Sequence, residues 1–96
     1  MKISLKQLCG EFCTERGNPG LQELIRFTIE AIEKNQHLEL DRTGVLILSI
    51  SFINEFTSRI ADRFSLQDFE KAVSFSPLLE ELYLYQIKRQ FELKKK

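Results

Sequence analysis

The stretch that decides the fold reads Leu38-Glu39-Leu40-Asp41-Arg42-Thr43-Gly44-Val45 and continues, after three residues, through Ser49-Ile50-Ser51-Phe52-Ile53-Asn54-Glu55-Phe56. Leu38 and Leu40 alternate with charged residues, which predicts a short strand with one apolar face. Gly44 permits a turn, and a second apolar run leads to a helix that we expect Ser51 to cap. This order predicts an α/β domain with polar loops at the carboxyl ends of its strands, where such sheets usually bind ligands or partners.

The apolar run over residues 45–48 leaves two geometries open. It could return beside residues 37–41 as an antiparallel hairpin, because three loop residues that include a glycine suit a hairpin. It could instead be a segment buried on both faces, as in a parallel sheet. We favour the second geometry because predicted helices flank the region on both sides.

Capping residues divide the rest of the chain into elements. Alternation over residues 2–5 and the brief run 73–75 predict two further strands, and residues 6–12 could be a loop or one helical turn. Helical spacing of apolar residues follows Asn18-Pro19, Ser51, Ser65 with Asp68 in a capping box, and Ser76-Pro77. We therefore expect a single domain over residues 1–96, with β-α-β-α-β-α order and helices packed on a mostly parallel or mixed central sheet.

Composition excludes several classes of function. The chain has 96 residues, of which 43% are apolar and 29% charged, and its net charge is zero, so nothing attracts nucleic acid to the whole domain. No apolar run approaches the roughly 20 residues of a membrane span, and the start lacks a signal-peptide core, so we expect a cytoplasmic protein that does not bind membranes. Cys9 and Cys13 are expected to be reduced and buried, and with one histidine in the chain we expect no metal and no cofactor.

Catalytic groups are sparse. His37 opens a strand, opposite the end where functional loops lie, and the glycines do not form a phosphate-binding loop. Asp41 and Glu55 could converge near residues 49–51 as a pair for acid–base work, although a turn acceptor and a solvated helix residue are the commoner roles. We expect no catalytic residue and no enzyme.

Several of these residues carry a resemblance that covers nearly the whole chain. Asp41-x-x-Gly44-Val45, Ser49-x-Ser51-Phe52-x-Asn54-Glu55-Phe56, Arg16 with Gly20, and Phe75-Ser76-Pro77 resemble the STAS-like family of small bacterial proteins, a domain of unknown function related to STAS anti-sigma-factor antagonists. Arg42 stands where that family usually has an apolar residue, and Asn54 where it usually has an aspartate. The position that is phosphorylated in STAS antagonists aligns with Ile50, so a phosphate would have to move to Ser49 or Ser51.

The resemblance implies a regulatory, non-enzymatic protein that switches between partners, often a histidine-kinase-like ATPase or an anti-sigma-type protein. We expect the partner to bind at the turn and helix start, through Asp41, Gly44, Ser49, Ser51, Phe52, Asn54 and Glu55. Because a helix start carries free amides and partial positive charge, binding of a small ligand or nucleotide there is an alternative.

The last helix offers another alternative, because its apolar residues cover more than half of its circumference. A surface helix usually shows a narrower apolar stripe. The helix could be deeply embedded, or its surplus apolar side could form a homodimer or scaffold contact through Leu84, Ile87 and Phe91.

Overall fold

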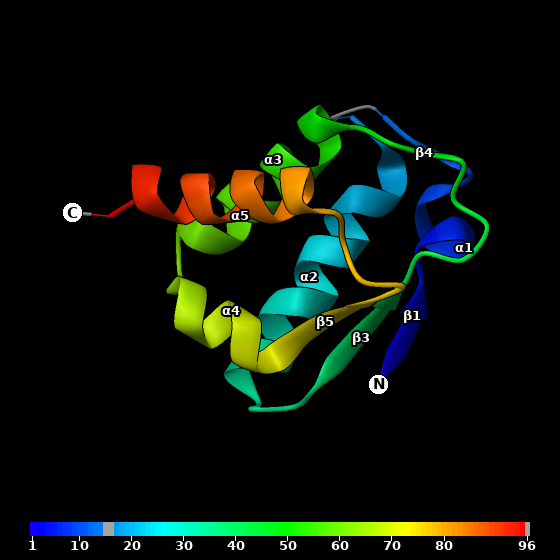
Figure 1. The fold of residues 1–96 in the computed structure, drawn as a ribbon. Helices are drawn as coiled ribbons and strands as arrows, with labels where there is room; N and C mark the ends of the chain where they lie inside the picture. The colour runs from blue at the N-terminus through cyan, green and yellow to red at the C-terminus, as the bar shows by residue number, and fades with distance from the viewer. Residues whose placement is uncertain (15–16, 96) are drawn as a thin grey trace.

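The computed structural model describes residues 1–14 and 17–95, so the expected role of Arg16 lies outside the described residues. The chain is an α/β domain whose described elements are five helices and five strands, and all the strand pairs are parallel. In chain order these are β1 (Lys2–Ser4), α1 (Leu5–Cys9), β2 (Phe12–Cys13), α2 (Pro19–Glu33), β3 (Leu38–Asp41), β4 (Ile47–Leu48), α3 (Ile50–Ala61), α4 (Leu66–Ala72), β5 (Val73–Ser76) and α5 (Glu81–Leu93). Figure 1 shows how they follow one another.

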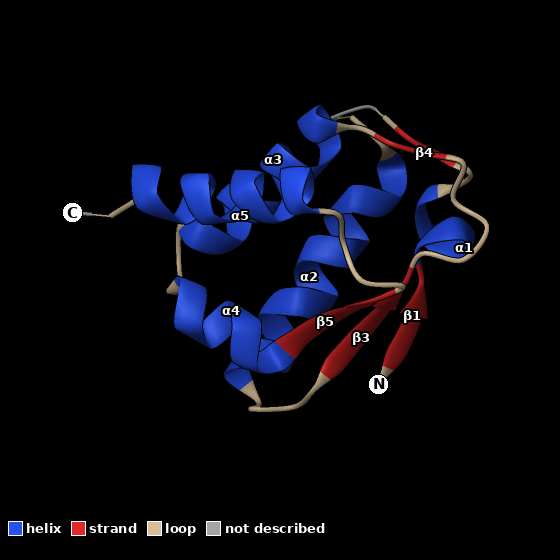
Figure 2. Cartoon of the chain, viewed as in Figure 1, coloured by secondary structure: helices blue, strands red, loops and turns tan. Residues whose placement is uncertain are grey.

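The main sheet has the strand order β1-β3-β5. The register sets Ile3, Leu40 and Phe75 side by side on the face that packs against the helices. The alternate positions include Lys2 and Glu39, which lie opposite each other and form an ion pair of 3.7 Å on the outer face. The helices gather on one side of this sheet (Figure 2), which leaves its other face polar.

Residues 45–48 do not form the doubly buried strand that we favoured. Only Ile47 and Leu48 are extended, and they pair in parallel with β2 to form a second, two-stranded sheet, so the hairpin is excluded as well. Leu46 and Ile47 are 66% and 51% exposed, whereas Leu48 is buried. The pair lies at the rim of the domain, where only one of its faces meets the core.

Two predicted helix starts are confirmed, those of α2 and α4, and a residue in the left-handed conformation follows α2. Asn18 caps α2 by accepting a hydrogen bond of 2.9 Å from the Gly20 amide. Asn35 follows that helix with a left-handed φ of 57°. Ser65 and Asp68 form the expected capping box at the start of α4.

Two other helix starts differ from the prediction. Ser49, and not Ser51, caps α3. The last helix begins at Glu81 and not after Ser76, because Ser76 is still part of β5 and its carbonyl accepts the Arg42 amide at 2.7 Å. Near the amino end, Leu5 is also displaced from the predicted strand and begins α1.

The last helix is embedded in the domain. Ile87 and Phe91 are only 4% and 8% exposed, so most of the surface of these two predicted oligomer contacts faces the core of their own chain. The Phe91 ring packs on Phe69, with 5.6 Å between the ring centroids, because α5 closes the core between α3 and α4. Leu84, the third predicted contact, remains exposed.

Candidate functional site

The start of α3 is tied to the loop that precedes α2. The Ser49 hydroxyl accepts the Phe52 amide at 3.1 Å and donates to the Thr14 carbonyl at 3.2 Å. Ser51, two residues further along the chain, is exposed. The two candidate serines therefore differ: Ser49 holds the local structure together, and Ser51 presents its side chain to solvent.

The remaining predicted residues on α3 differ in burial, because only Phe52 lies wholly in the core. Phe52 is fully buried in the core, so its predicted partner contact is wrong. The helix begins two residues earlier than a Ser51 cap would place it, because Ser49 is the cap. Asn54 and Glu55 are partly buried, and the Asn54 Oδ1 atom has no hydrogen-bond partner within the described chain.

Asp41 and Gly44 shape the turn after β3. The Asp41 carboxylate accepts the Thr43 amide at 2.9 Å and lies 3.8 Å from the Lys2 ammonium, and the Thr43 hydrogen bond, more than Lys2, holds its pKa below the usual range. Gly44 has a left-handed φ of 86°, and a Cβ there would lie 2.7 Å from the Lys6 side chain. Asp41 thus has the commoner role of a turn acceptor, and Glu55 is a partly buried residue of α3.

Arg42 fastens the same turn to the segment before α5. Its guanidinium donates to the Leu78 carbonyl at 2.7 Å and to both carboxylate oxygens of Glu80 at 2.9 and 3.1 Å, and it lies 5.9 Å from the Tyr83 ring centroid. A hollow of about 480 Å³ lies between the turn and this segment. The only sign of this role in the sequence is that Arg42 stands where the STAS-like family usually has an apolar residue.

Exposed apolar side chains next to this turn were missed from sequence. The β2–β4 register places Phe12 beside Ile47, and both point to solvent, whereas Cys13 and Leu48, the next pair along, are buried. Leu46 is exposed beside them. We call Phe12, Leu46 and Ile47 the β2–β4 patch. It adjoins the start of α3, because β4 ends at Leu48 and α3 begins two residues later, at Ile50.

The two thiols and the histidine form no nucleophile–base arrangement with each other. Cys9 and Cys13 are both buried and free, as expected. The Cys13 thiol donates to the Gly10 carbonyl at 3.5 Å. The interaction of the two neighbouring thiols, together with burial, raises the pKa of Cys9, and the same interaction lowers the pKa of Cys13. His37 lies at the start of β3, where its Nε2 is 2.9 Å from the Ser74 hydroxyl.

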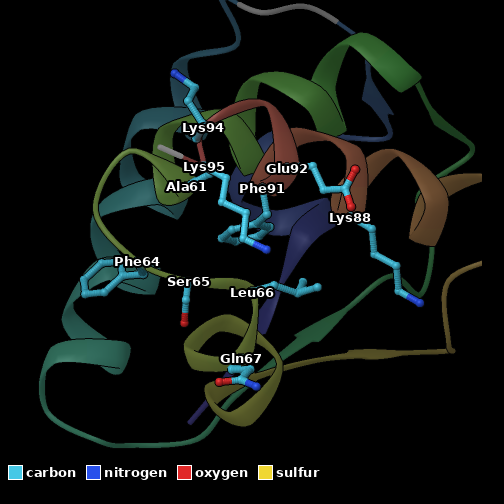
Figure 3. A pocket seen from close by; sticks show the side chains of 10 residues that line it. All are labelled: Ala61, Phe64, Ser65, Leu66, Gln67, Lys88, Phe91, Glu92, Lys94 and Lys95. Carbon is cyan, nitrogen blue, oxygen red and sulfur yellow. The ribbon is translucent and has the colours of Figure 1, made fainter.

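A separate hollow of about 530 Å³ lies between the end of α3, the start of α4 and the last turns of α5. Figure 3 shows the Phe64 and Phe91 rings and the Leu66 side chain around it, with Lys88 extending away from Phe91. One of its lysines, Lys94, is paired with Asp62 at 2.5 Å.

Comparisons of the chain with protein-family models, with curated proteins and with solved structures found no match. Residues 1–14 and 17–95 contain no group of three or more side chains placed to hold a metal ion. None of the helices in that part of the chain is long and apolar enough to cross a membrane.

Proposed function

We propose that this protein is a non-enzymatic regulatory module that binds another protein through the β2–β4 patch and the first turn of α3. The observation that carries the proposal is the position of Phe12 and Ile47, side by side and exposed, at the rim where α3 begins. Contiguous exposed apolar side chains bordered by polar residues are typical of protein-binding surfaces.

The backbone below the patch favours binding because it is held in place before any partner arrives. Cys13 and Leu48 anchor the two strands in the core, and the Ser49 hydroxyl links the start of α3 to Thr14. A partner would therefore lose little free energy in ordering this surface. The polar border is formed by Ser51 on one side and by the turn that contains Gly44 on the other.

Ser51 is the better candidate for regulation by phosphorylation. It is exposed, and the first turn of α3 contains no acidic residue, so a phosphate there would lie near the positive end of the helix dipole. Glu55, four residues further on, lies on the same side of α3 and opposes part of this effect. A phosphate on Ser49 would instead disrupt the helix cap and the Thr14 hydrogen bond. The phosphorylated and unmodified forms would then offer a partner two different surfaces.

The resemblance to the STAS-like family suggests a biological role for this binding. The resemblance implies that the protein switches between partners, and the partner we propose is a histidine-kinase-like ATPase or an anti-sigma-type protein. The family's phospho-acceptor position is Ile50 here, so the proposed switch depends on Ser51.

The test compares capture by wild-type protein with capture by three variants. Ile47→Asp charges the centre of the patch, Ser51→Asp imitates a phosphate, and Leu93→Asp charges an equally exposed leucine on α5 as the control. Proteins captured from a lysate of the source cell are identified, and their affinities are measured with purified components by calorimetry. We expect Ile47→Asp to weaken binding roughly 30-fold, as loss of a central apolar contact does.

Circular dichroism and thermal melting establish that the variants are folded. Equal affinity of wild type and Ile47→Asp for every captured protein would show that the β2–β4 patch is not the binding surface. A loss that Leu93→Asp shares would point to an indirect effect of added charge.

A further inference from the structure

We propose that the groove between α4 and α5 is an interface between two copies of this chain, related by a twofold axis that passes beside Leu84 in the first turn of α5. This surface is distinct from the β2–β4 patch, so the proposal is independent of the one above. It concerns self-association and not the capture of a different protein.

The groove is long and its floor is apolar. A hollow of about 300 Å³ lies between α4, β5 and the first half of α5, with Phe69, Val73, Leu79 and Ile87 among its lining residues. Leu66 and Lys88 line both this hollow and the one of about 530 Å³ in Figure 3, so the two hollows adjoin along α5.

The side of α5 above the groove has self-complementary charge. Glu81, Leu84 and Lys88 are spaced three and four residues apart, so they lie along one side of the helix, and all three are exposed. Within the described residues, neither Glu81 nor Lys88 forms an ion pair. If a second α5 lies antiparallel with the axis beside Leu84, Glu81 of each copy faces Lys88 of the other, and the twofold axis repeats the pair.

The same arrangement brings a protruding leucine to a hollow. Leu78 lies just before α5 and is 83% exposed, the most exposed large apolar side chain among the described residues. Phe91 and the larger hollow lie at the other end of the helix, about 10 Å from the proposed axis at 1.5 Å per residue. Because the second α5 runs in the opposite direction, Leu78 of the second copy would lie over the hollow beside Phe91 of the first. The twofold axis repeats this contact, so Leu78 of the first copy would lie over the same hollow of the second.

The adjoining sheet edge also favours a second copy. β5 is an edge strand, with β3 on one side only, and residues 73–79 contain no charged side chain. Open edges in monomers are usually protected by lysine or other charges, because their unpaired backbone groups invite pairing. Across the proposed axis the two β5 edges run antiparallel, so the dimer would cover both.

The first test measures the oligomeric state of the full chain by sedimentation velocity over a range of concentrations. We expect a dimer for wild type, a monomer for Leu78→Asp, and a dimer for the control Leu93→Asp, whose leucine is exposed on a different side of α5. Both positions are exposed, so neither change should unfold the chain. A wild type that remains monomeric at about 100 µM would overturn the proposal, because its dissociation constant would then be too weak for a specific dimer.

The second test addresses the geometry. Glu81→Lys or Lys88→Glu alone would put two like charges opposite each other at both Glu81–Lys88 contacts of the dimer, which should weaken the dimer about tenfold. The double variant restores opposite charges at both contacts and should recover wild-type affinity. Leu84→Cys, close to the axis, should form a covalent dimer on oxidation, whereas Leu93→Cys should not. Failure of the double variant to recover, or equal cross-linking at both cysteines, would show that the groove belongs to another occupant.

Discussion

Replacing Arg42 with methionine should destabilise the domain by about 2–3 kcal/mol, although the residue lies outside the apolar core. The Arg42 side chain is only 16% exposed, and its guanidinium donates to the backbone carbonyls of Pro77 and Leu78 at 3.3 and 2.7 Å. Hydrogen bonds from a charged donor contribute about 1.5–3 kcal/mol, and methionine leaves both carbonyls without this partner. The contact with Glu80 adds little, because that carboxylate is 61% exposed and such pairs contribute at most about 1 kcal/mol.

The assay is equilibrium unfolding in urea, followed by far-ultraviolet circular dichroism at equal protein concentration. For a domain of this size the loss corresponds to a decrease of roughly 10–20 °C in Tm. Arg42→Lys keeps the charge and loses the planar fork, so it should fall between wild type and Arg42→Met. Glu80→Gln should cost less than about 1 kcal/mol.

Two results would refute this reasoning about Arg42. Stability of Arg42→Met within about 0.5 kcal/mol of wild type, the range of ordinary surface substitutions, would mean that the carbonyl contacts contribute nothing. A Glu80→Gln variant as unstable as Arg42→Met would mean that the ion pair, and not the bonds to the backbone, holds the turn against the segment before α5.

Three further predictions concern single positions. Gly20→Ala should cost about 3 kcal/mol or more in urea unfolding, because its Cβ would lie 1.9 Å from a backbone carbonyl oxygen of α1, whereas Gly17→Ala, with open space around it, should be nearly neutral. Ser49→Ala should lower stability by about 1–2 kcal/mol through loss of the helix cap, and Ser51→Ala should leave the melting temperature unchanged. Because the pKa of Asp41 is lowered on folding, its stabilisation is present at neutral pH and lost as pH falls below 3.8 and through the folded value. The difference in unfolding free energy between wild type and Asp41→Asn should therefore vanish in strong acid.

Local sequence patterns predicted the elements whose signals are contained in a few neighbouring residues. Asn18 before a proline, and Ser65 with Asp68 three residues later, marked helix starts that the structure confirms. Alternation of Leu38 and Leu40 with charged residues predicted β3 and its buried face. These signals work because a cap or an alternating strand depends on contacts within about one turn or one pleat.

The candidate site was only partly predictable. Ser49 and Ser51 are both good caps in the same apolar context, and the choice between them depends on the Thr14 carbonyl, which is 35 residues away in the chain. Arg42 could not be given its role because its acceptors, the carbonyls of Pro77 and Leu78, are equally remote. A hydrogen bond to a distant backbone group leaves no periodic trace in the sequence.

The sequence by itself determined the α/β class, the position of most elements and the presence of more apolar residues than one narrow helix stripe requires. Only the tertiary structure decided which of them face water. It buried Ile87 and Phe91 on the inner side of α5 and exposed Phe12, Ile47 and Leu78. The physical reason is that hydrophobicity is a property of each residue, whereas burial depends on which other elements lie opposite it, and that is set by the packing of the whole chain.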